Sequence, residues 1–520
     1  MAISPIPRST TILVIGGGPA GSYAATVLAR DGFDVVVMER EHFPRYHIGE
    51  SMLPSFKTFL SFIGAREKVE RRGFIVKPGA AIKLNQFKQE GYTNFVAFDK
   101  ENSAWNVVRS ELDEILLRHA AESGAHVYEG VTVNEIQFSP SDPAVPVSAS
   151  WTTKTGQRGN TSFEWLIDAS GRTGIMSTKY LKNRTMNSSL RNIAFWSYWK
   201  NPGMYSPGTE RENAPWFEAL TDQSGWAWFI PLHNGTASVG IVQEERISRA
   251  KRAEMLLGPE EDKSSKHYLE QLKLAPGLLR FLEKSTFTGT VKSAGDYSYA
   301  ANRYAGPRFR IAGDAGAFID PLFSSGLHLA FTSALSAACT VAAAIRGHCT
   351  DEEAGAFHTT KFGTSYTRFL VVVWAAYRQI KSQSDPILSE VNEDNFDRAF
   401  NFLRPVIQGS TESDPQLTDK ELDEAIEFCK HAIAPTDPEM VAKVSKRIDP
   451  KLVALTAPVM NPKVVEQLMG EDDEAKQVLW KVNSDKALGI IFSEQNSFRS
   501  EVVNGFCANL ERGSIGLCKA

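Results

Sequence analysis

The stretch Thr10-Thr11-Ile12-Leu13-Val14-Ile15-Gly16-Gly17-Gly18-Pro19-Ala20-Gly21 places a glycine-rich turn directly after a run of apolar, β-branched residues. Residues 10–15 predict a buried strand, and residues 20–31 predict a helix. The pattern Gly16-x-Gly18-x-x-Gly21 therefore joins a strand to a helix, as a dinucleotide-binding turn does. The first glycine makes the turn, the second lets the backbone approach a pyrophosphate, and the third lets helix and strand pack closely.

A second apolar strand, residues 33–38, follows the helix and ends at Glu39. A carboxylate at this place can accept hydrogen bonds from the ribose diol of a dinucleotide. Strand, helix, second strand and acid agree, so we predict an α/β, Rossmann-like unit. The cofactor-binding residues expected from this unit are Gly16, Gly18, Ala20, Gly21, Glu39 and Arg40.

The rest of the chain alternates further strands with helices. An amphipathic helix is predicted over residues 110–121, with Ser110 as its N-cap. Residues 190–245 alternate aromatic and polar side chains, which indicates a sheet layer. Small and apolar residues at helical spacing predict a long packed helix over 327–345. The remaining strands are expected at 127–135, 147–153, 165–168 and 308–312.

We expect two parts: residues 1–350 as a core with an inserted sheet at about 180–300, and residues 351–520 as a mainly helical C-terminal region. Among 520 residues the five cysteines, at 339, 349, 429, 507 and 518, show no ligand-like spacing. We interpret them as reduced thiols in a cytoplasmic protein without a metal site. A net charge of −4 gives no indication of a nucleic-acid partner. The strongly apolar run 369–377 is too short to span a membrane.

Three segments resemble the flavin motifs of the aromatic-hydroxylase superfamily. Gly313-Asp314-Ala315 is similar to the motif whose aspartate binds the ribityl chain, although Asp314 could also cap a helix. Arg109 matches an arginine near the FAD phosphates, and Asp168-Ala169-Ser170-Gly171 matches the middle motif. The resemblance implies an FAD-binding monooxygenase fold.

Further segments resemble flavin-dependent halogenases. Trp226-x-Trp228-x-Ile230-Pro231 is similar to their WxWxIP signature, Gly49-Glu50-Ser51 to their GES stretch, and Phe318 to Gly326 to their FxxPxxSxG segment. The stretch from Gly73 to Gly79 resembles the one that carries the family's catalytic lysine, here Lys77. The resemblance implies FADH2, O2, and chloride or bromide, with halide beside Ser325 and Gly326 at the flavin face. It also implies that Gly326 is a cofactor-binding residue.

The two tryptophans lie two residues apart, so on a strand they share one face and could form a wall between flavin and substrate. Lys77 stands among apolar neighbours, so we expect a partly desolvated amine with a lowered pKa. Hypohalous acid would cross the wall to reach it. An ammonium could then hydrogen-bond to the oxidant, or a neutral amine could form an N-halo species.

Phe323 stands where tryptophan halogenases carry a glutamate, and this favours an electron-rich phenol over tryptophan as substrate. The pattern is most similar to fungal halogenases of phenolic polyketides. The resemblance implies that the helical C-terminal region, here residues 351–520, shapes substrate access. Expected partners are a phenolic substrate, a separate NAD(P)H flavin reductase and a carrier protein. His47, His233 and His328 are candidates for the base that ionises the phenol.

Three other functions share this scaffold: an NAD(P)H-dependent aromatic hydroxylase, a flavin-dependent reductase of isoprenoid lipids, and a non-catalytic flavin-binding protein. The hydroxylase would reduce its own FAD and would have no use for Lys77.

Overall fold

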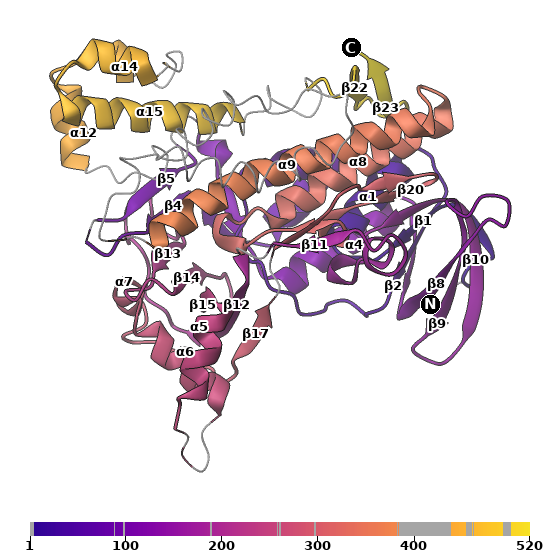
Figure 1. The fold of residues 1–520 in the computed structure, drawn as a ribbon, viewed down its shortest axis with the longest axis horizontal. Helices are drawn as coiled ribbons and strands as arrows, with labels where there is room; N and C mark the ends of the chain where they lie inside the picture. Colours follow the sequence, from indigo (N-terminus) through magenta and orange to yellow (C-terminus); the bar gives the residue numbers. More distant parts are fainter. Residues whose placement is uncertain are drawn as a thin grey trace.

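The computed structural model describes residues 5–520 except 88, 97–98, 188–189, 257, 259–261, 296–297, 382, 384–437, 454–459, 461 and 492–500. A twisted parallel sheet organises the first half of the chain, and a second large sheet packs beside it (Figure 1). The parallel strands, in sheet order, are β20 (Phe309–Ile311), β10 (Arg158–Asp168), β1 (Ser9–Ile15), β2 (Val35–Glu39) and β7 (His126–Glu129). The predicted α/β, Rossmann-like fold is confirmed.

The central strand β1 is buried on both faces. Ile12 and Val14 pack into a core with three helices, whereas Leu13 and Ile15 pack into a second core shared with the other large sheet. This alternation follows from the period of two in a strand. The three helices are α1 (Pro19–Arg30), α4 (Arg109–Glu122) and α8 (Gly326–Arg346).

Helix α8 is the most apolar long helix of the described chain. Its length and a mean hydropathy of 1.6 would suit a membrane span, but 83% of that window is buried inside the protein. It packs between α1 and the long helix α9 (Asp351–Ile380). A core helix accounts for this composition.

The second large sheet carries the segment with the two tryptophans. Its strands, in order, are β16 (Thr286–Phe287), β12 (Asn192–Lys200), β15 (Thr236–Glu244), β14 (Gly225–Pro231), β13 (Trp216–Ala219), β4 (Gly79–Lys83) and β5 (Gly91–Asn94), with β17 (Lys292–Gly295) also paired to β12. Along β14, Trp226, Trp228 and Ile230 join the core beside the parallel sheet, and Ala227 and Phe229 face the opposite core.

Two sequence-based details are wrong. The strand expected over 127–135 is interrupted at Gly130, whose φ of 72° turns the chain, so β7 joins the parallel sheet and β8 (Val131–Phe138) pairs with β9 (Pro146–Thr153). Ser110 does not cap α4, which begins one residue earlier. The ion pair between Arg109 and Asp113 spans one helical turn and needs Arg109 inside the helix.

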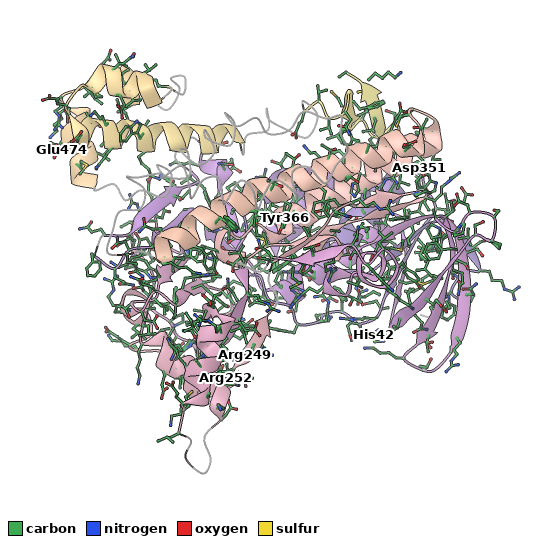
Figure 2. All side chains as sticks on the ribbon, viewed as in Figure 1. His42, Arg249, Arg252, Asp351, Tyr366 and Glu474 are labelled. Carbon is green, nitrogen blue, oxygen red and sulfur yellow. The ribbon has the colours of Figure 1, made fainter. Side chains whose placement is uncertain are left out.

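The described part of the C-terminal region contains helices and, at its end, a hairpin. Asp351 and Glu474 mark the first turns of α9 and α15 (Asp473–Ile491), which lie far apart in Figure 2. The chain then ends in a hairpin, β22 (Phe506–Asn509) and β23 (Gly516–Lys519), that packs on α8. The expectation of a mainly helical region over 351–520 did not include this hairpin. Three shorter helices complete the described part: α12 (Pro438–Ser445), α13 (Pro450–Val453) and α14 (Pro462–Met469).

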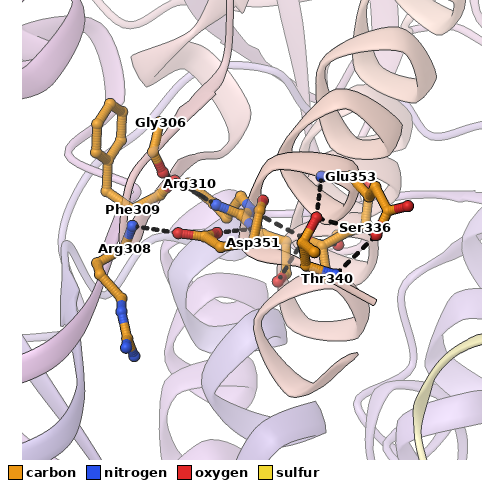
Figure 3. A network of polar contacts seen from close by, with 10 residues as sticks. Gly306, Arg308, Phe309, Arg310, Ser336, Thr340, Asp351 and Glu353 are labelled. Carbon is orange, nitrogen blue, oxygen red and sulfur yellow. Dashed lines mark hydrogen bonds and ion pairs between the residues drawn. The ribbon is translucent and has the colours of Figure 1, made fainter. Parts of the chain in front are cut away.

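A buried arginine joins the parallel sheet to α9 (Figure 3). The guanidinium of Arg310, on β20, donates to Asp351 Oδ1 at 2.8 Å and to Thr340 Oγ1 at 3.1 Å. Arg310 is fully buried, while the side chain of Asp351 keeps 28% of its exposure. The second carboxylate oxygen of Asp351 accepts the Arg308 amide at 2.8 Å.

We expect Asp351→Asn to destabilise the protein, because it leaves the buried Arg310 charge without its counterion. The partial exposure of Asp351 limits the expected cost to about 2 kcal/mol. Urea unfolding followed by tryptophan fluorescence measures it. Glu352→Gln, at the exposed neighbouring position, is the control, and an equal loss in both variants would contradict this role for Arg310.

Candidate active site

The glycine turn has the steric form that a dinucleotide needs. Gly16 has a φ of 100°, and a Cβ there would lie 2.3 Å from the carbonyl oxygen of Ala169. A Cβ at Gly21 would lie 1.9 Å from the Gly16 carbonyl oxygen. Gly18 precedes α1, which no side chain caps, so the helix N-terminus is suited to an anion. Ala20 is buried in the first turn.

Glu39 lies at the end of β2, beside the turn. One carboxylate oxygen accepts the Gly17 amide at 2.6 Å and the other accepts the Glu41 amide at 2.8 Å. Remaining lone pairs can accept from a ribose. Arg40 points away: its side chain is 64% exposed and its nearest acid, Glu41, lies at 4.0 Å. The cofactor role of Arg40 stays a prediction.

Two arginines share one buried carboxylate next to the glycine turn. Asp113 accepts from Arg109 Nε at 2.8 Å and from Arg45 Nη1 at 2.9 Å. Burial raises the pKa of Asp113, but the two guanidinium groups, Arg109 above all, more than offset this and lower it. The cluster therefore keeps an excess positive charge, which suits a pyrophosphate. Arg45 Nη2 lies 3.4 Å from the position of a Cβ on Gly18.

Sequence reasoning missed Arg45. Its only local signal is a basic residue six positions after Glu39. Its approach to Gly18 and Asp113 is a tertiary contact that no spacing rule predicts.

The distal motif meets the first one in space. A Cβ on Gly313 would lie 2.9 Å from the Ala20 side chain, so Asp314 stands beside the first turn of α1. Burial raises the pKa of the Asp314 carboxyl to about 6, and Arg109 opposes that rise. Asp314 lies inside a short 3-10 turn, Gly313–Ala315, and caps no helix. Asp168 is fully buried and accepts the Met176 and Ser170 amides, which fixes the middle motif.

The segment before α8 leaves polar groups unsatisfied at the start of that helix. Ser324 has a left-handed φ of 56°, Ser325 is the N-cap, and no side chain caps the helix. The Ser325 hydroxyl is buried without a hydrogen-bond partner, and a Cβ on Gly326 would meet nothing within 4 Å. An orphaned hydroxyl beside open space at a helix N-terminus fits a bound anion.

Lys77 is buried at the end of β3 (Ile75–Lys77), with 1% of its surface exposed. Its ammonium nitrogen donates to Ser51 Oγ and to the Met52 carbonyl oxygen, both at 2.8 Å, and lies 5.1 Å from the centre of the Phe95 ring. Both acceptors are neutral. Burial lowers the pKa of Lys77 to about 7, so both protonation states are populated near neutral pH. The expected burial of the Lys77 amine is confirmed. Its catalytic role stays a prediction.

The two tryptophans of β14 lie in contact, with ring centres 5.8 Å apart. Trp226 Nε1 donates to the Tyr377 hydroxyl at 2.7 Å, and Trp228 Nε1 donates to Ser238 Oγ at 3.2 Å. Ile230 and Pro231 continue the same buried strand. The whole strand is buried and both indole nitrogens have hydrogen-bond acceptors. The role of the segment as a separating wall stays a prediction.

Glu50 lies in the wall of a cavity of about 190 Å³ together with Arg109, Tyr198 and His47. Burial raises the pKa of Glu50 to about 7, and hydrogen bonds from Ser238 and Tyr198 moderate this. The Tyr198 hydroxyl donates to Glu50 at 2.7 Å. Sequence reasoning placed Glu50 in a family motif but assigned it no chemistry.

The three candidate histidines do not converge. Burial, and then Arg109, lowers the pKa of His47 to about 4, so its ring is neutral at physiological pH. His233 lies 3.2 Å from Glu111, and His328 Nδ1 lies 2.8 Å from Ser55 Oγ. Their role as base stays a prediction.

Fold and site together define a class: an FAD-dependent flavoprotein of the aromatic-hydroxylase type. The chain also matches a family model described as tryptophan halogenase over residues 11–100 and 80–378. It is 55% identical to the flavin-dependent halogenase armH1 of Armillaria mellea over 99% of both chains. It is 42% identical to the sulochrin halogenase gedL of Aspergillus terreus, over 99% of this chain and 94% of the relative.

Solved structures agree. The flavin-dependent halogenase CmlS aligns with a TM-score of 0.67 and 27% identity over 83% of this chain and 74% of that one. The chondrochloren halogenase CndH aligns with a TM-score of 0.65 and 25% identity, over 83% of this chain and 98% of the CndH chain. The chain therefore belongs to the flavin-dependent halogenase family, whose cofactor is FAD.

We expect Lys77→Met to stabilise the protein more at about pH 6 than at about pH 10. Below pH 7 the lysine is charged in both the folded and the unfolded chain, and the folded chain bears the full cost of desolvating it. That cost falls as pH rises from the folded pKa of about 7 and is gone above the unfolded pKa of about 10.4, because in this interval the folded chain has already lost the proton that the unfolded chain keeps. Thermal unfolding at both pH values measures the difference. An equal gain at both, or the same gain from the exposed Lys179→Met, would contradict a lowered pKa at Lys77.

Proposed function

We propose that this enzyme uses FADH2, O2 and chloride or bromide to halogenate an electron-rich phenol, with hypohalous acid as the diffusing oxidant and Lys77 as the catalytic residue. The buried Lys77 amine carries this proposal. It lies among apolar and neutral groups with a pKa of about 7, which an ordinary structural lysine does not need.

The residues present fit FAD. The glycine turn, the positive charge of Arg45 and Arg109, and the carboxyl of Asp314 surround the first turn of α1. When bound, reduced FAD with O2 supplies the oxidising equivalent for halide. Ser325 and Gly326 would hold the halide ion, through the orphaned hydroxyl and the backbone amides.

Trp226, Trp228, Ile230 and Pro231 would keep the substrate away from the flavin and keep the passage dry. At its far end, an ammonium on Lys77 would donate a hydrogen bond to hypohalous acid and make the halogen more electrophilic. A neutral amine would instead exchange N–H for N–halogen and release water. The lowered pKa permits either form.

A phenol supplies its own reactivity. Ionisation of the hydroxyl drives electrons to the ortho and para carbons, so the acid that Phe323 replaces is not needed. The relative named as a sulochrin halogenase supports a polyketide-type phenol.

We further propose a cytoplasmic enzyme served by a separate NAD(P)H flavin reductase, because one dinucleotide fingerprint is visible and FAD would fill it. A carrier protein that presents the substrate is a further proposed partner.

We expect Lys77→Ala and Lys77→Arg to abolish halogenation while FAD binding and FADH2 oxidation continue. Alanine removes the amine, and a guanidinium has a different geometry and stays charged. Mass spectrometry of product beside FADH2 oxidation measures both activities. Lys57→Met is a matched control, because Lys57 is also buried and donates to a serine, Ser103, at 2.7 Å. Near-normal product from Lys77→Ala would exclude Lys77 from catalysis.

We expect a resorcinol-type polyketide to be halogenated in preference to tryptophan when both compete at equal concentration under excess FADH2. The reaction should occur ortho or para to a hydroxyl and should accelerate as the phenol ionises. Preferential halogenation of tryptophan would overturn the phenol proposal while leaving the family assignment intact. Addition of oxygen in place of halogen would instead favour the hydroxylase.

A further inference from the structure

A buried carboxyl group joins the Trp226 segment to the loop before α8. Asp320 is fully buried and stands five residues before Ser325. One of its carboxylate oxygens accepts the Leu322 amide at 3.1 Å, within its own loop. The other accepts the hydroxyl of Tyr377, on α9, at 2.7 Å and the side-chain amide of Asn192, on β12, at 3.1 Å. Polar groups from three segments, the loop before α8, helix α9 and strand β12, thus meet at one carboxylate.

The direction of each hydrogen bond is fixed by chemistry. The indole nitrogen of Trp226 can only donate, so the Tyr377 hydroxyl accepts from it, at 2.7 Å. Tyr377 has a single proton, and that proton is donated to Asp320. The indole ring is therefore held through one hydroxyl group by a carboxylate of the loop before α8, residues 318–326, which we call the halide loop after the proposed role of Ser325 and Gly326. Its neighbour Trp228 donates to Ser238 Oγ at 3.2 Å, and Ser238 in turn hydrogen-bonds to the carboxyl of Glu50, which lies outside the loop before α8.

The carboxylate is costly to keep at this place. Burial raises the pKa of Asp320 to about 6, and hydrogen bonds from Tyr377, Asn192 and the Leu322 amide oppose the rise. A neutral asparagine would fill the same space without that desolvation cost. A charged acceptor gives shorter and stronger hydrogen bonds than a neutral one, and it rejects any rotamer of Tyr377 that leaves it unpaired.

We propose that Asp320 and Tyr377 are positioning residues that lock the Trp226 indole against the halide loop, so that oxidised halogen is passed on to Lys77 and does not leak into solvent. This inference rests on the proposed function of the two segments. Neither residue touches the reacting atoms in this arrangement. Their effect is on the fraction of oxidant delivered, and flavin oxidation itself should be unaffected.

The test compares Tyr377→Phe and Asp320→Asn with wild type in the full-length, FAD-loaded enzyme. Three quantities are measured: FADH2 oxidation, halogenated phenol, and hypohalous acid captured in solution by monochlorodimedone. In both variants we expect halogenated product per FADH2 to fall about five-fold or more, the factor that the loss of one buried hydrogen bond permits. Captured oxidant should rise, and FADH2 oxidation should stay within about two-fold.

The sheet offers a matched control on its opposite face. Tyr268 is fully buried, accepts the Trp199 indole N–H at 2.8 Å and donates to the Val239 carbonyl oxygen at 3.0 Å. Tyr268→Phe deletes an equivalent hydroxyl between a tryptophan and an acceptor, but reaches neither carboxylate nor halide loop. Tyr268→Phe should leave the ratio of halogenated phenol to captured hypohalous acid unchanged.

A double-mutant cycle separates positioning from a general loss of stability. Trp226→Phe removes the indole N–H, so adding Tyr377→Phe to it should change the captured fraction much less than Tyr377→Phe does in wild type. Three outcomes would overturn the proposal. The effects of Trp226→Phe and Tyr377→Phe on captured oxidant could be fully additive, or captured oxidant could rise equally in Tyr268→Phe. Halogenated product could also stay unchanged in both Tyr377→Phe and Asp320→Asn. If Tyr377→Phe does not fold, Asp320→Asn decides it alone. A wild-type enzyme that yields neither halogenated product nor captured oxidant would instead contradict the proposed function.

Discussion

The dry layer of aromatic side chains between the two large sheets is the constraint on which the site depends. Trp196, Trp226 and Trp228 fill it, and it takes in one face of the central strand β1. Burial raises the pKa of two carboxyl groups beside it, Glu50 and Asp320. Burial also lowers the pKa of Lys77, whose neighbours Met52 and Phe95 belong to the core on the other face of the parallel sheet. Three unusual acidities therefore have one physical cause, desolvation.

The parts of the site that the sequence predicts are those governed by local sterics or by periodicity. The steric roles expected of Gly16 and Gly21 agree with the structure, because a side chain at either position would collide with the backbone. The shared face of Trp226 and Trp228 follows from the period of a strand. The apolar neighbours of Lys77 indicate its desolvation before any coordinates are known.

What the sequence does not predict depends on contacts between distant segments. Arg45 reaches Gly18 only because Asp113, on another element, holds it. Helix α4 begins at Arg109, before the expected cap Ser110, because the ion pair between Arg109 and Asp113 competes with the capping preference of Ser110. The network of Asp320 and Tyr377 joins residues 57 apart in sequence, and no local pattern marks either. The terminal hairpin escaped notice because two four-residue strands are too short for periodicity to identify.

Helix α8 runs from the proposed halide site to the hairpin at the end of the chain. It begins at Gly326 and ends at Arg346, whose guanidinium binds the Ile515 carbonyl oxygen of the terminal hairpin at 2.6 Å. A helix of 21 residues is about 31 Å long and stiff over that length. The terminal hairpin and the turn at Ser325 and Gly326 thus lie at opposite ends of one helix. A surface linkage attached at Ala520 would therefore hold the enzyme by the hairpin that is hydrogen-bonded to the far end of this helix.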